Sequence, residues 1–184
     1  MRQHTLIGLL MASLLAPAAA HADERADFLQ KAYLSFCVKH LDNYAGLRQQ
    51  LIEQQLPKLP PQQAGHFLQQ QAGDAWPLPY QGQFGHFVLV LPEGDQACSV
   101  MARSGDSTEI RRWFVSLAEQ APAPLLATAL DDASVDTPLS GPASQLSWQW
   151  ATEHAPRRLV LSLTTAEKPD APIQAKASLA LTER

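Results

Sequence analysis

The pattern of apolar and polar positions is clearest in the middle of the chain, between residues 83 and 103. Residues 87–91 form an apolar run of types that favour strands, and an apolar pattern resumes at residues 97–102. Two strand-like runs joined by about four residues that include Pro, Gly and Asp predict a β-hairpin. We expect this hairpin to lie at the centre of a sheet.

The first part of the chain follows a helical period instead. Residues 23–41 place apolar side chains at steps of three and four, so that they share one face of a helix. A second and more polar stripe covers residues 47–56 and ends at Pro57. A third short helix is predicted over residues 62–71, with Gly73 as its C-cap.

Two segments flank the hairpin. Residues 74–80 contain two prolines, and we expect them to form an extended connection into the hairpin. After the hairpin, Asp106 and Glu109 fit a capping box, with an acceptor at the N-cap and an acid three residues later. The pattern therefore predicts a helix that begins there and stops before Pro122.

The last third of the chain has a period of two. Every second position in residues 173–181 is apolar, which is typical of a strand with one buried face. Residues 131–142, rich in Asp, Ser, Pro and Gly, are expected to form a loop. The elements predict an α+β fold in which N-terminal helices pack on a mainly antiparallel sheet, in the order ααα-ββ-α-ββββ. The four strands predicted after the last helix are 125–130, 145–151, 158–165 and 173–181.

The first 22 residues have the pattern of a secretory signal peptide. Arg2 precedes an apolar stretch at residues 6–15, and small residues follow that suit cleavage after Ala20 or Ala22. The stretch is shorter than the roughly 20 residues that a membrane-spanning helix needs, and no cysteine stands at the cleavage site for a lipid anchor. We therefore predict a single mature domain, residues 23–184, without a membrane anchor in the periplasm of a Gram-negative bacterium.

The charge of the chain narrows the class of partner. The formal net charge is −4, and removal of the signal peptide takes away Arg2 and no acid. A mildly acidic domain argues against nucleic acid, which requires a basic surface to meet its phosphates. No polybasic segment suits anionic lipid. The sequence points to no cofactor, and the partner that we expect is a protein.

Cys37 and Cys98 are the two cysteines of the chain. Two cysteines in an oxidising compartment most often pair, so we predict a disulfide that ties the N-terminal helices to the hairpin. By the chain-entropy argument, closing a loop of about 60 residues contributes about 4 kcal/mol. Two alternatives stay open. Cys37 and His40 have a spacing that suits two metal ligands, although no second pair matches them, and an unpaired thiol is a nucleophile.

No motif of a known catalytic class is present. The chain has no Gly-x-Ser-x-Gly, no His-Glu-x-x-His, no phosphate-binding loop and no dinucleotide fingerprint. The positions of its histidines select no triad, because triads are recognised by geometry and not by sequence position. We therefore expect binding rather than catalysis. The alternative is a small hydrolase with an unfamiliar site that uses His40, His86 or Cys37.

Aromatic and acidic residues are the candidates for an interface. Trp76 and Tyr80 lie in the proline-rich stretch before the hairpin, and Asp131 and Asp132 lie in the expected loop. Protein interfaces use Trp and Tyr as anchors. These four residues are our candidates for partner binding.

Trp148 and Trp150 stand two residues apart on a predicted strand and so share a face. If that face is buried, they pack against the helix that carries Trp113 and Phe114. If it is exposed, they form an aromatic platform for a ligand or partner. Burial is the interpretation that we favour, because large aromatic residues are mostly buried.

Several short motifs resemble those of a group of small exported proteobacterial proteins. The likeness covers about residues 28–118, centres on the cysteine pair and offers no catalytic residue. Similar proteins include periplasmic immunity partners of antibacterial lipases and phospholipases delivered by type VI secretion. The resemblance therefore implies an immunity-type inhibitor that occludes an effector enzyme; an envelope ligand-binding module is a further alternative. The motifs are Phe36-Cys37-Val38 with His40-Leu41, Gly73-Asp74-Ala75-Trp76-Pro77, residues 87–92, and Cys98-Ser99-Val100 with Ala102-Arg103.

Overall fold

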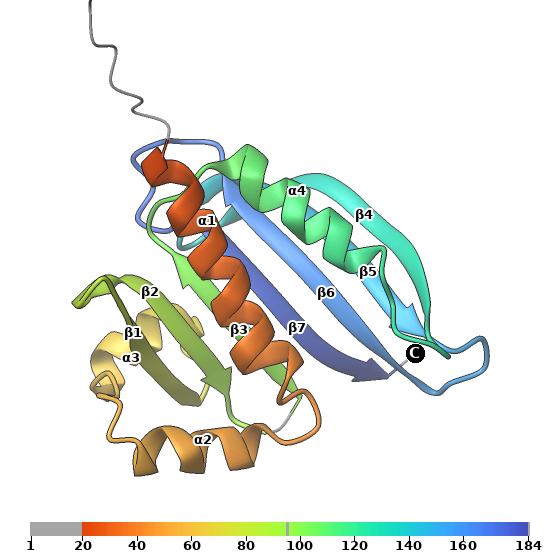
Figure 1. Ribbon diagram of the computed structural model, residues 1–184, viewed down its shortest axis with the longest axis horizontal. Helices are drawn as coiled ribbons and strands as arrows, with labels where there is room; N and C mark the ends of the chain where they lie inside the picture. The colour runs from red at the N-terminus through yellow and green to blue at the C-terminus, as the bar shows by residue number, and fades with distance from the viewer. Residues whose placement is uncertain (1–19, 95, 184) are drawn as a thin grey trace, which may run out of the picture.

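The computed structural model describes residues 20–94 and 96–183 and has the predicted α+β architecture, with helices packed on an antiparallel sheet (Figure 1). Residues 1–19 of the predicted signal peptide lie outside the described residues. No helix among the described residues is both long and apolar enough to cross a membrane. In chain order the elements are α1 (Ala20–Ala32), the π-helical η1 (Tyr33–Val38), α2 (Tyr44–Glu53), α3 (Pro61–Leu68), β1 (Gly73–Tyr80), β2 (Gln83–Pro92), β3 (Ala97–Ala102), α4 (Ser107–Ala118), β4 (Leu126–Thr137), β5 (Gly141–Ala151), β6 (Arg157–Ala166) and β7 (Ala175–Glu183).

The seven strands form one sheet in the order β1-β2-β3-β7-β6-β5-β4. Every neighbouring pair is antiparallel. The predicted hairpin, β2 and β3, is paired as expected, and the last strand, β7, lies against β3. Helix α4 carries the chain from β3 to the far edge, from which β4 to β7 return as a meander. The sheet centre is therefore built from segments distant in sequence.

Two segments differ from the predictions. Residues 74–80 belong to strand β1 and are not a connection, since Asp74 pairs with Leu91 and Leu78 with Phe87. Prolines are tolerated there because β1 is an edge strand. Most of the expected loop at 131–142 continues β4 as far as Thr137, because β5 offers a ladder partner along its whole length. The strands therefore follow the order βββ-α-ββββ.

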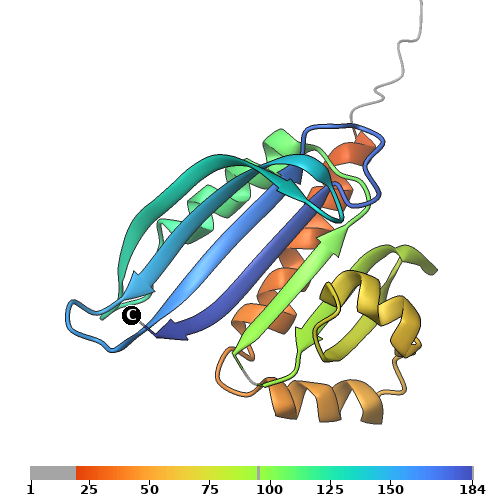
Figure 2. The same cartoon turned by 180° about the vertical axis from the view of Figure 1, so that it is seen from behind.

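The helices cover the sheet unevenly. Figures 1 and 2 show α1 and α4 side by side over one face of the sheet. On the other face, α3 packs against β1 and β2. Among the described residues, no helix lies over β5, β6 and β7 on this second face. We call the part of the second face formed by β5, β6 and β7 the open face.

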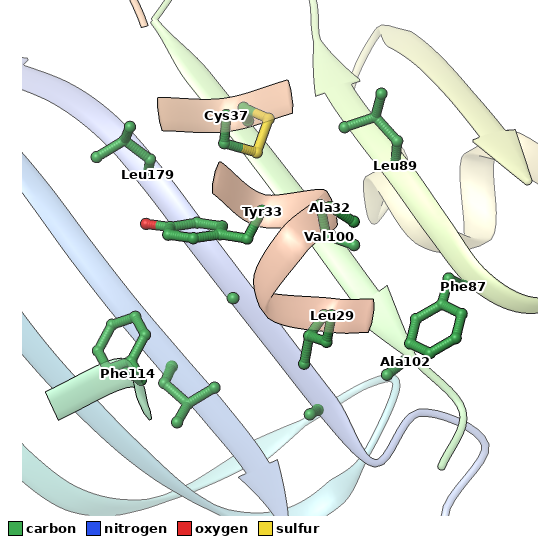
Figure 3. Packing of buried hydrophobic residues seen from close by; sticks show 14 of the residues in the cluster. Leu29, Ala32, Tyr33, Cys37, Phe87, Leu89, Val100, Ala102, Phe114 and Leu179 are labelled. Carbon is green, nitrogen blue, oxygen red and sulfur yellow. A yellow bond between two sulfur atoms is a disulfide. The ribbon is translucent and has the colours of Figure 1, made fainter. Parts of the chain in front are cut away.

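The main core lies between α1, η1, α4 and the sheet (Figure 3). Leu29, Tyr33 and Phe114 are fully buried there. The Tyr33 hydroxyl donates a hydrogen bond to the main-chain oxygen of Ser178 at 3.1 Å, and burial raises the pKa of this phenol. The apolar helix face predicted for residues 23–41 is thus confirmed as the face that contacts the sheet.

A disulfide joins Cys37 of η1 to Cys98 of β3, as predicted (Figure 3). The two Cα atoms are 5.4 Å apart, and the residues are 61 positions apart in the chain. The bond leaves neither sulfur as a free thiolate. Cys37 is therefore neither a metal ligand with His40 nor a nucleophile in this form of the protein.

The predicted cap of α4 is present. Asp106 Oδ1 accepts a hydrogen bond from the Glu109 backbone N–H at 2.9 Å. From this start, α4 buries residues at steps of four, namely Ile110, Phe114 and Ala118. The capping box and the helical period together locate this helix from sequence alone.

Gly73 begins β1 instead of capping α3. The C-cap of α3 is Gln69, in the left-handed region with φ 52°. Gly73 has φ +149°, and a Cβ atom on it would lie 2.5 Å from the Leu91 oxygen. A glycine is required here because β1 passes too close to β2 for a side chain.

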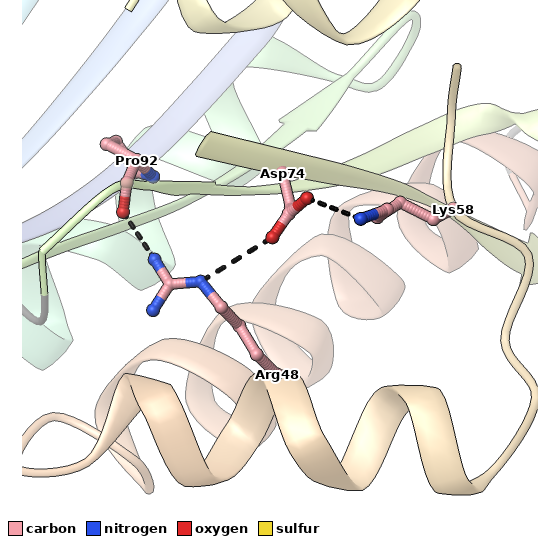
Figure 4. Close-up of polar contacts among 4 residues, drawn as sticks. All are labelled: Arg48, Lys58, Asp74 and Pro92. Carbon is pink, nitrogen blue, oxygen red and sulfur yellow. Dashed lines mark hydrogen bonds and ion pairs between the residues drawn. The ribbon is translucent and has the colours of Figure 1, made fainter. Parts of the chain in front are cut away.

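Helix α2 is held against the start of β1 by a polar cluster (Figure 4). Lys58 Nζ lies 2.8 Å from Asp74 Oδ1, and Arg48 Nε lies 3.8 Å from Asp74 Oδ2. Arg48 also donates to the main-chain oxygen of Pro92 on β2. One carboxylate thus connects α2, the α2–α3 connection and the edge of the sheet.

Candidate functional site: the outer strand and the open face

Strand β4 is the outer strand at one edge of the sheet and pairs only with β5. Its other side meets no strand in the part of the chain that the structure describes. Its 12 residues make it the longest strand, and most of its side chains are exposed. Leu126 and Leu130 are 62% and 42% exposed. An edge of this length with exposed apolar side chains can pair with a strand from another protein.

The opposite edge, β1, is protected against such pairing. Pro77 and Pro79 have no N–H to donate. The Ala75 oxygen already accepts a hydrogen bond from the Leu59 N–H at 2.8 Å. The two edges therefore differ, and β4 is the one open to a partner strand.

The two predicted aspartates are consecutive on β4, directly after a β-bulge, and strand alternation places their side chains on opposite faces. Ala129 pairs with Trp148 and Asp131 with Ser147, so that Leu130 is the extra residue. Asp132 faces α4, where its Oδ2 lies 2.6 Å from Arg111 Nη2. Asp131 faces the other side and has no ion pair or hydrogen bond from its side chain among the described residues. One carboxylate of this pair is thus neutralised by Arg111, and the other is not.

The other two predicted interface residues lie away from β4. Trp76 is fully buried in the main core, which contradicts our expectation that it contacts a partner. Tyr80 is half-buried at the opposite edge of the sheet, in contact with Phe28 and Phe87 at ring distances of 5.1 and 5.3 Å. The structure therefore brings together Asp131 and Asp132 and separates them from Trp76 and Tyr80.

Trp148 and Trp150 face the helices, as we favoured from sequence. Trp150 is buried and its Nε1 donates to the Ala118 oxygen. Trp148 is half-buried and packs against the main core. This placement contradicts the alternative in which the two indoles form an exposed aromatic platform.

The open face carries a row of serines that crosses four strands. Ser99 on β3 pairs with Ser178 on β7, Ser178 with Ser162 on β6, and Ser162 with Ser147 on β5. Asp131 on β4 is the next residue in the row. Because serine side chains are small, this part of the sheet carries no large side chains. Sequence reasoning missed the row because its register depends on pairing between distant strands.

The next row holds Lys176, between Met101 on β3 and Thr164 on β6. Its amine has no hydrogen bond or ion pair within residues 20–94 and 96–183, and burial lowers its pKa. No hydrogen bond therefore links this amine to a serine or threonine hydroxyl. A nucleophile and base pair of the kind that hydrolases use is not set up here.

Two further absences bear on the chemistry. Within the described ranges, no group of three or more His, Cys, Asp or Glu residues is placed to hold a metal ion. Strands β4 to β7 contain no histidine, so the serine row has no imidazole beside it on its own strands.

No protein-family model matches this chain, and neither a curated protein nor a solved structure matches it.

Proposed function

We propose that the protein is an exported binding protein of the inhibitor type, which occludes a partner enzyme by pairing with it along β4. The observation that supports this most strongly is the outer edge of β4, which pairs with no strand among the described residues and carries exposed leucines beside Asp131 and Asp132. The sequence resemblance to periplasmic immunity proteins suggests the class of partner, a lipase or phospholipase effector. The Cys37–Cys98 disulfide agrees with an oxidising compartment such as the periplasm.

The charge of the edge indicates what the partner presents. Residues 126–142 contain three aspartates and no lysine or arginine, and Asp131 is free of an internal ion pair. A basic strand or loop would gain main-chain hydrogen bonds from β4 and charge complementarity from Asp131. The same negative charge disfavours self-association between two copies of this edge.

Rigidity is the second property that an inhibitor requires. The disulfide ties η1 to β3, and α4 is joined to β4 by the Arg111–Asp132 ion pair. A scaffold whose binding edge is already ordered loses little conformational entropy when it binds. This supports occlusion by a preformed surface.

The test is a pull-down from periplasmic extract with the tagged mature protein, with neighbouring genes co-expressed and captured proteins identified by mass spectrometry. Wild type is compared with Asp131→Lys and with Asp170→Lys, a matched reversal of an exposed acid in the β6–β7 loop. We expect a stoichiometric enzyme partner with wild type and with Asp170→Lys, and its loss with Asp131→Lys.

Two results would contradict the proposal. Recovery of the protein alone under all conditions argues against an inhibitor, and equal capture by all three proteins argues against β4 as the interface. Export is tested separately by osmotic-shock fractionation of cells that express the full chain. Retention of the protein in the cytoplasmic fraction would refute the periplasmic location.

A further inference from the structure

Lys176 is a half-buried lysine without an internal counter-charge. It lies on β7 with Met101 and Thr164 as its strand neighbours. Holding an ammonium group in a partly desolvated place costs free energy unless a negative group compensates it. No carboxylate forms an ion pair with it within 20–94 or 96–183, although Asp136 borders the same cavity.

The amine borders a cavity of about 290 Å³, which we call the Lys176 cavity. Its polar lining includes Gln145, Thr164, Ser140 and Asp136. The wall beside β4 is held in place by Ser140, whose hydroxyl donates to the Ile173 oxygen at 2.9 Å and whose N–H donates to Thr137 Oγ1 at 3.0 Å. The cavity is therefore formed before any ligand arrives.

A second, apolar hollow of about 450 Å³ adjoins it on the same face of the sheet, beside α3. We call this the α3 trough. Its exposed lining is mainly apolar, and both hollows are of the size that small-molecule sites have. Leu139 and Ile173 line both the trough and the Lys176 cavity, so the two hollows lie side by side. The trough is also lined by Leu59, Phe67, Pro77 and Val88, and by the polar or charged residues Gln63, His66 and Arg103.

The two hollows together define the chemistry of a ligand. A single ammonium with hydrogen-bonding neighbours suits an anionic head group. Asp136 borders the same cavity and opposes a dianion such as a phosphate monoester, which leaves a singly charged carboxylate as the better match. The apolar trough next to it suits an unbranched hydrocarbon chain, whose burial is favourable in proportion to its area.

We propose that the protein binds a free fatty acid, with its carboxylate against Lys176 and its chain in the α3 trough. The Lys176 cavity borders the last residues of β4, Val135 to Thr137, whereas the pairing proposed above uses the free hydrogen-bonding edge of β4 and Asp131. Fatty-acid binding goes beyond the inhibitor function, and neither depends on the other. A protein exported to the cell envelope that binds fatty acids would carry or sense the product of lipid ester hydrolysis.

The experiment is isothermal titration calorimetry on the mature protein, freed of co-purified lipid on a hydrophobic resin. The probes are sodium acetate, octanoate and dodecanoate, with 1-dodecanol as the uncharged analogue. The variants are Lys176→Met, Lys176→Arg, and Lys168→Met as a matched control at an exposed lysine of the β6–β7 loop. Circular dichroism melting confirms that each variant is folded, and Lys176→Gln replaces Lys176→Met if the latter does not fold.

We expect dodecanoate to bind with one molecule per chain, and the affinity to rise by roughly two- to fourfold for each added methylene that enters the trough. Lys176→Met is expected to weaken dodecanoate binding by about tenfold or more, while Lys176→Arg and Lys168→Met stay within about threefold of wild type. 1-Dodecanol is expected to bind more weakly than dodecanoate. Absence of dodecanoate binding, or equal binding by Lys176→Met, would overturn the proposal.

Discussion

The indole Nε1 of Trp150 donates a hydrogen bond to the main-chain oxygen of Ala118 at 2.6 Å. This bond joins β5 to the last turn of α4. Trp148, two residues earlier on the same strand, also faces the helices, but its Nε1 is buried without a hydrogen-bond partner among the described residues. The two indoles therefore share a strand and a face, and they differ in this hydrogen bond and in burial, since Trp150 is buried and Trp148 half-buried.

We expect Trp150→Phe to lower the free energy of unfolding by about 1–3 kcal/mol more than Trp148→Phe does. Trp150→Phe removes a donor and leaves the Ala118 oxygen buried without it, whereas Trp148→Phe removes an N–H that had no partner. Urea denaturation of both variants measures the difference. Equal losses would show that the bond to Ala118 adds nothing beyond the packing of the ring.

The disulfide is expected to supply a large part of the stability. Cys37→Ala/Cys98→Ala removes the cross-link between η1 and β3, and we expect a loss of about 4 kcal/mol because the bond closes a loop of some 60 residues in the unfolded chain. The midpoint of urea denaturation reports it. Dithiothreitol should produce a similar loss in wild type and none in the double variant. A double variant as stable as wild type would refute this account.

The ion pairs of Asp74 are expected to contribute to the free energy of unfolding by an amount that depends on salt concentration. Asp74→Asn keeps the shape of the side chain and removes the charge that Lys58 and Arg48 face. Because the Asp74 side chain is 28% exposed, we expect a loss of about 1 kcal/mol or less. The loss should shrink in 1 M salt, which screens the pairs.

Asp170→Asn is the control for Asp74→Asn, because Asp170 is an exposed acid in the β6–β7 loop. It should leave the free energy of unfolding unchanged at both salt concentrations. A loss for Asp74→Asn that is the same at low and high salt would assign the effect to hydrogen bonding rather than to charge.

The helices and inner strands could be predicted from sequence because their signals are local. The N-cap at Asp106 and the helical spacing of Leu29, Tyr33 and Cys37 are set by residues a few positions apart, and the structure confirms them. The disulfide followed from the number of cysteines and the expected compartment. None of these inferences required knowledge of which strands are neighbours.

Strand β1 and the second half of β4 were missed because composition outweighed alternation, whereas the strand predicted at residues 125–130 is the first half of β4. Pro77 and Pro79 suggested a connection, yet an edge strand tolerates them, and the period of two from Trp76 to Leu78 was a usable signal for burial. Asp131 and Asp132 suggested a loop, but pairing with β5 continues through them. The residue types within these two segments therefore predicted their structure poorly, because that structure depends on the neighbouring strands with which they pair.

The position of Lys176 could not be predicted from sequence. It alternates with Ala175 and Ala177, so the pattern indicates a solvent-facing lysine on a half-buried strand. Its partial burial comes from Met101 beside it and from the segments around Leu139 and Ile173, which are brought together only by the long-range register of the sheet. Contacts between residues that are distant in sequence therefore create the environment of Lys176.

The same lysine predicts an unusual dependence of stability on pH. Burial lowers the pKa of Lys176 from 10.5, its ordinary value. Below the lowered pKa, the folded and unfolded states both hold the proton, and the folded state bears the cost of the buried charge. Between the lowered pKa and 10.5 the unfolded state binds more protons, so this group makes the folded state more stable as pH rises.

We therefore expect Lys176→Met to be more stable than wild type at neutral pH, because a similarly long apolar side chain carries no charge to desolvate. The difference should narrow as pH rises towards 10.5. Urea denaturation of both proteins across this range measures it, and subtracting one curve from the other cancels the titration of groups unaffected by the substitution. Asp136 is the other charged side chain that borders the same cavity. A difference that is constant with pH, or a less stable variant at neutral pH, would show that the protein compensates the charge of Lys176 in the unbound state.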